Sequence, residues 1–482
     1  MILIALGRFI QYALLLATLR ISTTLLQPDE MGKVSIVVTT VGFFSLFLIN
    51  PVGMFINRRF LNWDANAMAK RYLRYFWLYL LLISLIAAIA SLGLMHFHFV
   101  DLSMHPSVLL FLIGGSLFFG TLNQTAIPTL NLLGYKRWFM GLTIATSLLS
   151  LLCAVGLTLG FIKDAQFWLC GILLGQAVVG VFGLLVFYRK LKEPIQNRLH
   201  PSSLNSGSLT RLLHFAWPIA LAVGLGWLQS QAYRYQLTES LGLAKLGLFV
   251  AGFGISSGLI AGFDSMVTTY FGPIFSRRLS QMHDEHYSSA WQHYASAVIP
   301  SLMLTGFLII ALAPELTKIL LGPSYQEAGV FVIWGALAEV ARTATGVYAL
   351  GAHAKMNTRL LILPNFLGAG LALILVPMSA PIYGLQGIGA ALFIAALGSL
   401  ITSIFVNKKH IAVTISVNQV SKALFLGIGM LALAYVIEQF ALPQQSTLHS
   451  LIMVISLGLI FLLAQWNLLN KLADMKLQGE HS

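Results

Sequence analysis

The sequence predicts an all-α membrane protein with about 14 transmembrane helices, and three observations carry this prediction. Hydrophobic residues make up 57% of the 482 residues, and charged residues make up only 9%, against about 25% in a soluble domain. The apolar runs extend over roughly 20 residues, the length of a membrane-spanning helix and too long for a barrel strand. Because lipid offers no hydrogen bonds to the backbone, such runs adopt helices.

The spans follow from apolar runs bounded by polar or turn residues. Residues 1–188 are expected to form a first lobe with spans near 3–26, 34–56, 75–95, 108–132, 139–160 and 167–188. The polar segment 189–212, rich in Ser and Pro, predicts a linker. A second lobe over 213–406 follows, with spans near 213–237, 247–275, 294–321, 328–350, 360–379 and 385–406. Residues 407–470 add spans near 420–440 and 449–468, and 471–482 form a tail.

The distribution of Lys and Arg predicts the orientation. With the first end placed inside, 21 of the 29 Lys and Arg residues fall in inside segments, 3 fall in outside segments, and 5 lie within or at the edge of spans. Cytoplasmic loops of membrane proteins carry such an excess of positive charge. Both termini are therefore expected in the cytoplasm, and the net charge of +13 needs no nucleic-acid partner.

Four features recur in the same order in the two expected lobes. They are an arginine near the end of a span (Arg20, Arg234), a turn glycine 12 or 13 residues later (Gly32, Gly247), a proline (Pro51, Pro273) and an Arg-Arg pair (58–59, 277–278). Both copies begin on the same side of the membrane. The sequence therefore predicts a parallel repeat with its pseudo-axis along the membrane normal.

Several motifs carry a resemblance to a known family. They are Gly7-Arg8-Phe9 and Arg20 in the first span, the turn from Leu25 to Gly32, the stretch from Asn50 to Arg59, and Trp217-Pro218. In these motifs the chain resembles the multidrug/oligosaccharidyl-lipid/polysaccharide (MOP) exporter superfamily, and within it the Wzx-type polysaccharide flippases. Fourteen spans also occur in the related lipid II flippases, whereas twelve are commoner among drug antiporters and many O-antigen flippases, so the subfamily stays open.

The resemblance implies two six-helix lobes in a V that rock to open a central cavity alternately to each side. It implies a flippase that moves a polyprenyl-diphosphate-linked oligosaccharide, a repeat unit of O-antigen, capsule or exopolysaccharide, to the outer leaflet of a bacterial inner membrane. The expected partners are this lipid-linked oligosaccharide, membrane lipids and glycan polymerase or assembly proteins. No cofactor or metal is implied.

Charged and polar side chains within the spans are the candidate substrate ligands. An arginine at a helix centre costs roughly 2.5–3.5 kcal/mol by insertion scales, but a guanidinium stays protonated and binds phosphate in a bidentate manner. Arg20 and Arg234 are expected to face a shared cationic cavity, with Arg8, Gln231, Tyr235, Asn123 and Gln124 as further ligands. The alternatives are headgroup contacts for the arginines and interhelical hydrogen bonds for Asn123 and Gln124.

Acidic side chains within the spans are candidates for coupling transport to an ion gradient. Asp264 is the first, because a carboxylate inside a membrane must be paired, protonated or hydrated. Glu339 is the second, although Arg342 three residues later predicts an ion pair on one helix. The chain lacks the phosphate-binding loop of an ATPase. His283, His286 and His293 lie in an inside connector and are interpreted as a solvated loop rather than a metal site.

Two other functions compete with the flippase. A drug or metabolite antiporter on the same scaffold would favour an acidic cavity, whereas arginines are at least as prominent as carboxylates here. A membrane glycan polymerase or ligase would need a large outer loop with acid and base groups, and the expected outer loops are short. The sequence therefore predicts a transporter, not an enzyme.

Overall fold

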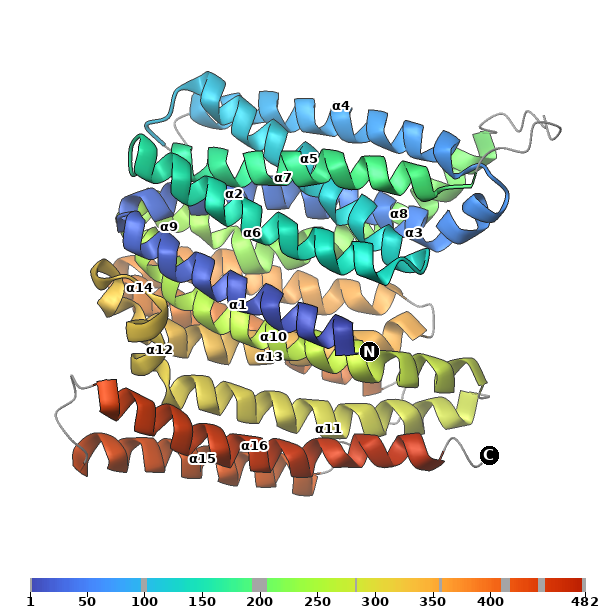
Figure 1. Ribbon diagram of the computed structural model, residues 1–482. Coiled ribbons are helices and arrows are strands. Elements are labelled where there is room, and N and C mark those ends of the chain that lie inside the picture. The colour runs from blue at the N-terminus through green and yellow to red at the C-terminus, as the bar shows by residue number, and fades with distance from the viewer. Residues whose placement is uncertain are drawn as a thin grey trace. The chain divides into compact units, whose positions relative to one another are not determined.

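The computed structural model shows an all-helical protein (Figure 1). It describes residues 2–96, 102–192, 206–281, 284–354, 358–408, 417–440 and 447–478. Within these ranges every regular element is a helix, and eleven helices are long and apolar enough to cross a membrane. The predicted polytopic all-α class is confirmed. The contacts within the chain define two compact units, Met1–Gly247 and Leu248–Ser482.

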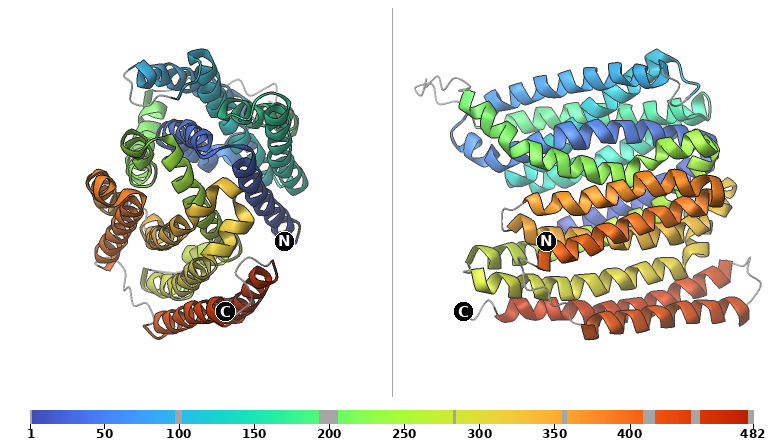
Figure 2. Two further views of the ribbon diagram at one scale, coloured as in Figure 1. Left: turned by 90° about the vertical axis from the view of Figure 1, so that its left-hand side faces the viewer. Right: turned by 180° about the vertical axis from the view of Figure 1, so that it is seen from behind.

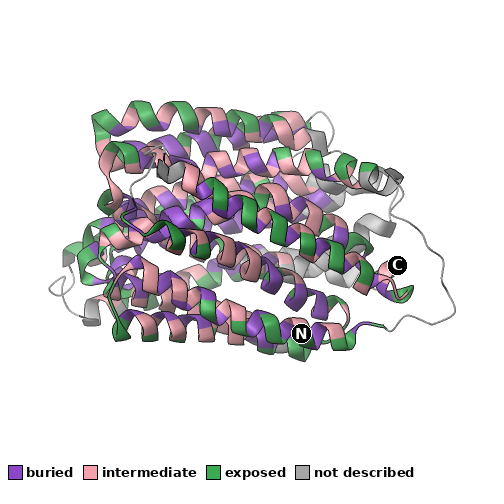
Figure 3. Ribbon diagram, turned by 90° about the horizontal axis from the view of Figure 1, so that it is seen from above, coloured by how far each residue is buried: buried purple, intermediate pink, exposed green. Residues whose placement is uncertain are grey.

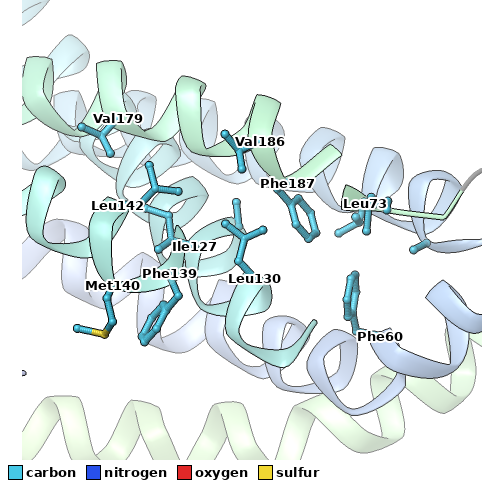
Figure 4. Packing of buried hydrophobic residues seen from close by; sticks show 13 residues of the cluster. Phe60, Leu73, Ile127, Leu130, Phe139, Met140, Leu142, Val179, Val186 and Phe187 are labelled. Carbon is cyan, nitrogen blue, oxygen red and sulfur yellow. The ribbon is translucent and has the colours of Figure 1, made fainter. Parts of the chain in front are cut away.

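Within its described residues, the first unit contains nine α-helices and the start of a tenth. They are α1 (Ile2–Leu25), α2 (Pro28–Phe44), α3 (Asn50–Ala65), α4 (Ala69–His96), α5 (Pro106–Leu132), α6 (Lys136–Gly160), α7 (Ala165–Lys190), α8 (Ser206–Gln231), α9 (Tyr233–Leu241) and α10, which begins at Leu243. Helix α7 packs along α5 and α6, α4 packs along α5, and α1 packs along α6. Buried side chains such as Phe60, Leu130 and Phe187 fill the space between them (Figure 4).

The second unit contains the rest of α10 (Leu243–Gln281) and six further α-helices. They are α11 (Asp284–Ala311), α12 (Ala313–Leu320), α13 (Gly329–Ala354), α14 (Ile362–Lys408), α15 (Val417–Phe440) and α16 (Thr447–Gln478), with 3-10 turns η2 (Pro323–Ala328) and η3 (Thr358–Leu361). Within α14 two helices meet at Gly384, whose φ of 56° breaks the helix. This break separates the two spans predicted at 360–379 and 385–406.

The last two helices pack on the second unit's own core. Both α15 and α16 lie along α11 (Figures 1 and 2), with Met430, Met453 and Leu457 buried between them. The amide of Gln465 in α16 donates a 2.8 Å hydrogen bond to the carbonyl of Ser301 in α11. These helices are therefore an integral part of the unit.

The lobe boundaries predicted from the sequence stay a prediction. Residues 193–205 of the expected linker, 409–416 of the connector before α15 and 479–482 of the tail lie outside the described residues.

Lipid-facing stripes are visible along the helices, where exposed residues alternate with buried ones around each helix (Figure 3). In α4 the exposed side chains include Leu78, Leu82 and Ile89, with up to 66% of the side chain accessible. A soluble protein would not leave such a row of large apolar groups in water. Hydrocarbon is the surrounding that suits them.

Helix α2 begins at a turn whose chemistry is local. Pro28 occupies the first helical turn, and Asp29 and Glu30 follow it, which suits the positive end of the helix dipole. Glu30 also joins this turn to α7, since one carboxylate oxygen accepts the Ala165 N–H at 2.7 Å and the other binds Lys33 at 2.6 Å. Glu30 thus joins the start of α2 to the start of α7.

An irregular turn separates α2 from α3. Five residues, Ser45–Ile49 (η1), form a π-helical turn directly before Asn50-Pro51. Proline lacks an N–H and clashes with the carbonyl four residues earlier, so a regular helix cannot continue through it. The hydroxyl of Tyr79 donates to the Leu48 carbonyl at 2.8 Å. A side chain thus satisfies a backbone group in the irregular turn, as lipid requires.

The two turn glycines of the predicted repeat make matching contacts. A Cβ added to Gly32 would collide with the carbonyl of Leu243, and a Cβ added to Gly247 would collide with the carbonyl of Pro28. Each glycine thus meets the residue four positions before the other glycine. This reciprocal contact is what a two-fold axis produces, and it explains why both positions lack a side chain.

Candidate functional site

A break between α8 and α9 positions the polar segment around Arg234. Helix α8 ends at Gln231, and α9 begins at Tyr233 after Ala232. The N–H of Tyr235 reaches the carbonyl of Ala232 at 3.2 Å, three residues back rather than four. Such tight turns within a long helix often mark a hinge. The break places Arg234 and Tyr235 at the first turn of a new helix.

The guanidinium of Arg234 is held by uncharged groups. Its Nη1 donates a 2.8 Å hydrogen bond to the hydroxyl of Thr39 in α2. Its Nε lies 3.5 Å from the hydroxyl of Tyr233, and the group lies 5.8 Å from the centre of that ring. Among the described residues, no carboxylate is paired with the Arg234 guanidinium, and its Nη2 makes no hydrogen bond. The positive charge of Arg234 is thus not neutralised by an ion pair there.

Tyr235 makes a parallel contact with the neighbouring threonine. Its hydroxyl lies 2.7 Å from the hydroxyl of Thr40. Thr40 lies 2.9 Å from the Ile36 carbonyl, to which it donates its own proton, so Tyr235 is the donor in the contact between the two hydroxyls. Two adjacent residues of α9 are therefore hydrogen-bonded to two adjacent residues of α2. The pairing fixes the direction of Arg234 relative to α2.

A row of aromatic rings adjoins these hydrogen bonds. The ring of Phe43 in α2 stacks on the ring of Phe47 in η1, with centroids 5.6 Å apart. Phe43 contacts Trp227 of α8 edge-on at 5.0 Å, and Trp227 lies 6.4 Å from Tyr235. Aromatic faces bind the apolar faces of ligands and the edges of other rings. The row therefore places an aromatic surface beside the cation.

Several buried polar atoms around this cluster have no hydrogen-bond partner within the described residues. They are the indole Nε1 of Trp227, the amide Nε2 of Gln229 and the hydroxyl of Ser35. Gln229 is only 4% exposed. An unsatisfied buried polar group costs about 1–3 kcal/mol. Such atoms are therefore usually found where water or a ligand forms the missing hydrogen bond.

The other predicted ligands of the first unit lie in different surroundings. Arg20 is half-buried near the end of α1, and its carbonyl accepts the hydroxyl of Thr24 at 2.7 Å. Arg8 donates to the amide oxygen of Gln11 at 2.9 Å. Gln231 is half-buried and Gln124 is exposed. The convergence of Arg20 and Arg234 on one cavity stays a prediction.

Asn123 is buried, at 7% exposed. Its amide nitrogen donates to the carbonyls of Phe119 and Gln176, at 2.9 and 2.7 Å, and its oxygen accepts from Thr146 at 3.4 Å. The bond to Phe119 lies within α5, whereas those to Gln176 and Thr146 join α5 to α7 and α6. They are the interhelical hydrogen bonds that the sequence offered as the alternative to substrate binding.

The acidic candidates lie in the second unit. Glu339 binds Arg342 at 2.6 Å on the same helix, α13, so the predicted pairing is confirmed, whereas a role in ion coupling stays a prediction. Asp264 in α10 is half-buried. Among the described residues no cluster of three His, Cys, Asp or Glu side chains suited to a metal is present. His283 lies outside them.

Sequence reasoning missed the partners on α2 and α8. Thr39 and Thr40 form an adjacent polar pair inside an otherwise apolar span, and this signal could have marked α2 as a helix with polar contacts, but not α9 as its partner. Phe43 and Phe47 follow Thr39 at intervals of four residues, which places them on one helix face. Trp227 gave no separate signal among nine tryptophans.

Comparison with known proteins identifies the fold. No family model and no curated protein sequence matches the chain. Among solved structures, the chain is similar to a lipid II flippase, MurJ, in an inward closed conformation, with a TM-score of 0.73 and 13% identity over 98% of this chain and 100% of that chain.

Two multidrug transporters are also similar. A MATE family transporter of the MOP superfamily, in an inward-facing conformation, gives a TM-score of 0.59 with 16% identity over 83% of this chain and 94% of its own. A mutant of the Vibrio cholerae MATE transporter VcmN gives 0.54 with 14% identity over 84% and 93%. The chain therefore shares its fold with this flippase and with these MATE transporters.

Proposed function

We propose that the chain is a flippase that moves a polyprenyl-diphosphate-linked oligosaccharide from the inner to the outer leaflet of a bacterial inner membrane. The cargo is a repeat unit of O-antigen, capsule or exopolysaccharide. The protein acts as a transporter rather than an enzyme, and it works by alternating access. Both termini face the cytoplasm, in accord with the excess of positive charge in the inside segments.

The arrangement of Arg234 is the observation that carries this proposal. Moving a diphosphate through about 30 Å of hydrocarbon requires a counter-charge. Arg234 offers a guanidinium whose recorded partners among the described residues are uncharged hydroxyls and a ring. Beside it lie Phe43, Trp227 and Tyr235, which suit the apolar faces of sugar rings. Cation and aromatic surface together match a sugar linked to a phosphate.

The structural neighbours support a transporter of this general kind. The flippase MurJ is named for lipid II, and its fold extends over 98% of this chain, including α15 and α16. The two MATE transporters match a smaller share, 83% and 84%. A lipid-linked cargo is favoured by this difference, and its identity as an oligosaccharide lipid rests on the chemistry around Arg234.

Arg20 is proposed as the second phosphate ligand, with Arg8, Gln231 and Gln124 as further contacts. Asp264 is proposed as the site that couples transport to an ion gradient, because one charge crossing 100 mV supplies about 2.3 kcal/mol. Glycan polymerase and assembly proteins are proposed to receive the product on the outer side.

Deletion of the gene in its own host tests the proposal directly. We expect surface glycan to disappear and its lipid-linked precursor to accumulate, because the carrier cannot cross the bilayer by itself. The measurements are glycan on whole cells and lipid-linked saccharide in extracted membranes. The gene supplied on a plasmid should restore both.

The competing antiporter predicts a different outcome. If deletion leaves the glycan and its precursor unchanged but lowers resistance to cationic drugs, the chain is a drug transporter, as the likeness to the two MATE proteins would then indicate. In that case an Asp264→Asn variant should abolish resistance, since a cationic substrate or a proton needs the carboxylate.

A further inference from the structure

A cavity with a largely apolar surface and several polar side chains lies within the first unit, between α1, α6 and α7. Its volume is about 250 Å³, and seven of its eleven lining residues carry a hydroxyl or an amide. The ones used below are Gln11 and Thr18 from α1, Thr146 and Ser147 from α6, and Gln176 from α7. None of the eleven is charged. A contact between two lipid-embedded helices has no need of so many hydrogen-bonding groups.

Part of this polarity holds the helices together, and part of it does not. The hydroxyl of Ser150 donates to the Ile172 carbonyl at 3.2 Å, which joins α6 to α7. In contrast, the side-chain amide of Gln176 and the Nε2 group of Gln11 have no recorded hydrogen bond among the described residues. Both residues are half-buried and line the cavity. Water or a ligand with several hydroxyl groups would satisfy them.

The wall of the cavity is built to keep its shape. Asn123 lies behind it and donates to the Gln176 carbonyl at 2.7 Å, and Thr146 donates to Asn123. Gly171 and Gly175 of α7 pack so closely on the backbone of α6 that an added Cβ at either would collide with it. The polar groups therefore stay in fixed positions, which lowers the entropy lost on binding.

A cation lies next to the cavity on α1. Arg8 precedes Gln11 by three residues and Thr18 by ten, so all three share one face of the helix. Its Nη1 donates to the Gln11 oxygen at 2.9 Å, and the guanidinium lies 5.9 Å from the centre of the Phe139 ring. Its Nε is buried without a hydrogen bond among the described residues. The site thus combines an uncharged pocket with the guanidinium of Arg8 beside it.

We propose that this cavity binds one sugar ring of the cargo through its hydroxyl groups, with Arg8 receiving an anionic group attached to the sugar. The inference rests on the proposed flippase function and names a sugar subsite for it. The volume lies just below the range of about 300–1,000 Å³ for pockets of drug-sized ligands, which suits a single ring. The lining has no carboxylate for a cationic drug or a coupling ion. The anion is either the carrier's diphosphate or an acidic group of the sugar.

Protection of an introduced thiol tests binding in the cavity. In a background of Cys153→Ala and Cys170→Ala, a Ser147→Cys variant places a near-isosteric thiol in the wall. Its reaction with N-ethylmaleimide is timed in the purified, lipid-reconstituted protein. The probes are the host's lipid-linked saccharide, extracted from membranes, and the two products of hydrolysis at its glycosyl–phosphate bond, the free saccharide and the polyprenyl diphosphate. We expect the intact lipid to slow the reaction about tenfold and the free saccharide to slow it at higher concentration.

Substitutions in the same background identify the ligand groups. Gln176→Leu should raise the concentration needed for protection about threefold to tenfold, the cost of one lost hydrogen bond. Thr18→Val should raise it less, and it keeps the fold, because the Thr18 hydroxyl only donates to the Leu14 carbonyl of its own helix. The matched control is Gln439→Leu, at an exposed position of α15, which should change nothing. The variant Arg8→Gln identifies the anion that Arg8 receives. If the free saccharide no longer protects this variant, the anion is an acidic group of the sugar. If only the intact lipid loses its protection, the anion is the diphosphate.

The proposal is overturned if polyprenyl diphosphate protects as well as the intact lipid, because the cavity would then bind no sugar. It is also overturned if no probe protects Ser147→Cys. Deletion of the gene tests the proposed flippase function separately. A deletion that abolishes surface glycan, together with an unprotected cavity, refutes the sugar subsite alone. A deletion without effect on glycan refutes the flippase.

Discussion

Arg234 and Arg342 are both half-buried arginines in membrane-spanning helices, and their surroundings differ. Arg342 binds Glu339 at 2.6 Å, one turn away on its own helix. Arg234 reaches across to α2 and donates to the hydroxyl of Thr39. The first pair is formed by a single helix and carries no net charge. The second contact requires two helices and leaves the charge of the guanidinium in place.

The difference shows which arginine is available to bind an anion. A cation that is paired within its own helix satisfies the rule that charges in a membrane need partners, and it needs nothing further. A cation held by hydroxyls keeps its attraction for anions, because hydroxyls orient it without neutralising it. The two arginines therefore call for different tests, one of transport and one of stability.

Loss of Arg234 should have the largest effect. If Arg234 binds the phosphate as proposed, Arg234→Ala removes two charge-assisted hydrogen bonds to it, each worth about 1.5–3 kcal/mol, so export should fall at least about 100-fold. Arg234→Lys should recover part of it, since lysine keeps the charge but not the bidentate geometry. Surface glycan and lipid-linked precursor are measured at matched protein levels. Normal export by a well-expressed Arg234→Ala protein would remove the reason to distinguish the two arginines.

Breaking the pair in α13 should affect stability rather than transport. Glu339→Gln leaves Arg342 without its counter-charge, which costs on the order of 1–3 kcal/mol here, less than the roughly 3–5 kcal/mol of a fully buried pair. The double variant Glu339→Gln/Arg342→Gln should recover most of the loss, as thermal unfolding in detergent would show. If the double variant is stable but exports nothing, the pair takes part in ion coupling.

Much of the fold could be predicted because its signals are local. Apolar runs located the spans, Pro51 marked the place of the π turn, and the two turn glycines marked the point where α2 and α10 touch. The break at Gly384 was expected for the same reason, since the segment 380–384, with a proline and a glycine, separated two apolar runs. Each of these signals lies within a few residues of the structure that it specifies.

The site could be predicted only in part, because its contacts join distant segments. Arg234 was identified as a costly charge, but Thr39 precedes it by 195 residues, and nothing in a hydropathy pattern aligns the two. Asn123 shows the opposite difficulty. A polar residue in a span has the same sequence signature whether it binds cargo or a neighbouring carbonyl, and only the packing of α5 against α7 distinguishes them.

The hydroxyl that orients Arg234 should have a moderate effect. Thr39→Val keeps the shape of the side chain and removes the acceptor of the 2.8 Å hydrogen bond. Since the guanidinium remains but is less well oriented, export should fall about threefold to tenfold. The same change at Thr305, which bonds only within α11 and to Gln465, is a control without an arginine. An equal loss of export in both variants would indicate a general packing defect.

Tyr235→Phe should have the smallest effect and gives the finest comparison. It removes the hydroxyl that donates to Thr40 at 2.7 Å and keeps the ring that continues the aromatic row from Trp227. If the ring serves as a surface for sugar and the hydroxyl only fixes α9 to α2, export should fall about two- to threefold, the low end for one neutral hydrogen bond. Tyr235→Leu, which also removes the ring, should then fall further. Equal export in the two variants would show that the aromatic row has no part in recognition, and that Arg234 alone distinguishes this region from the paired arginine of α13.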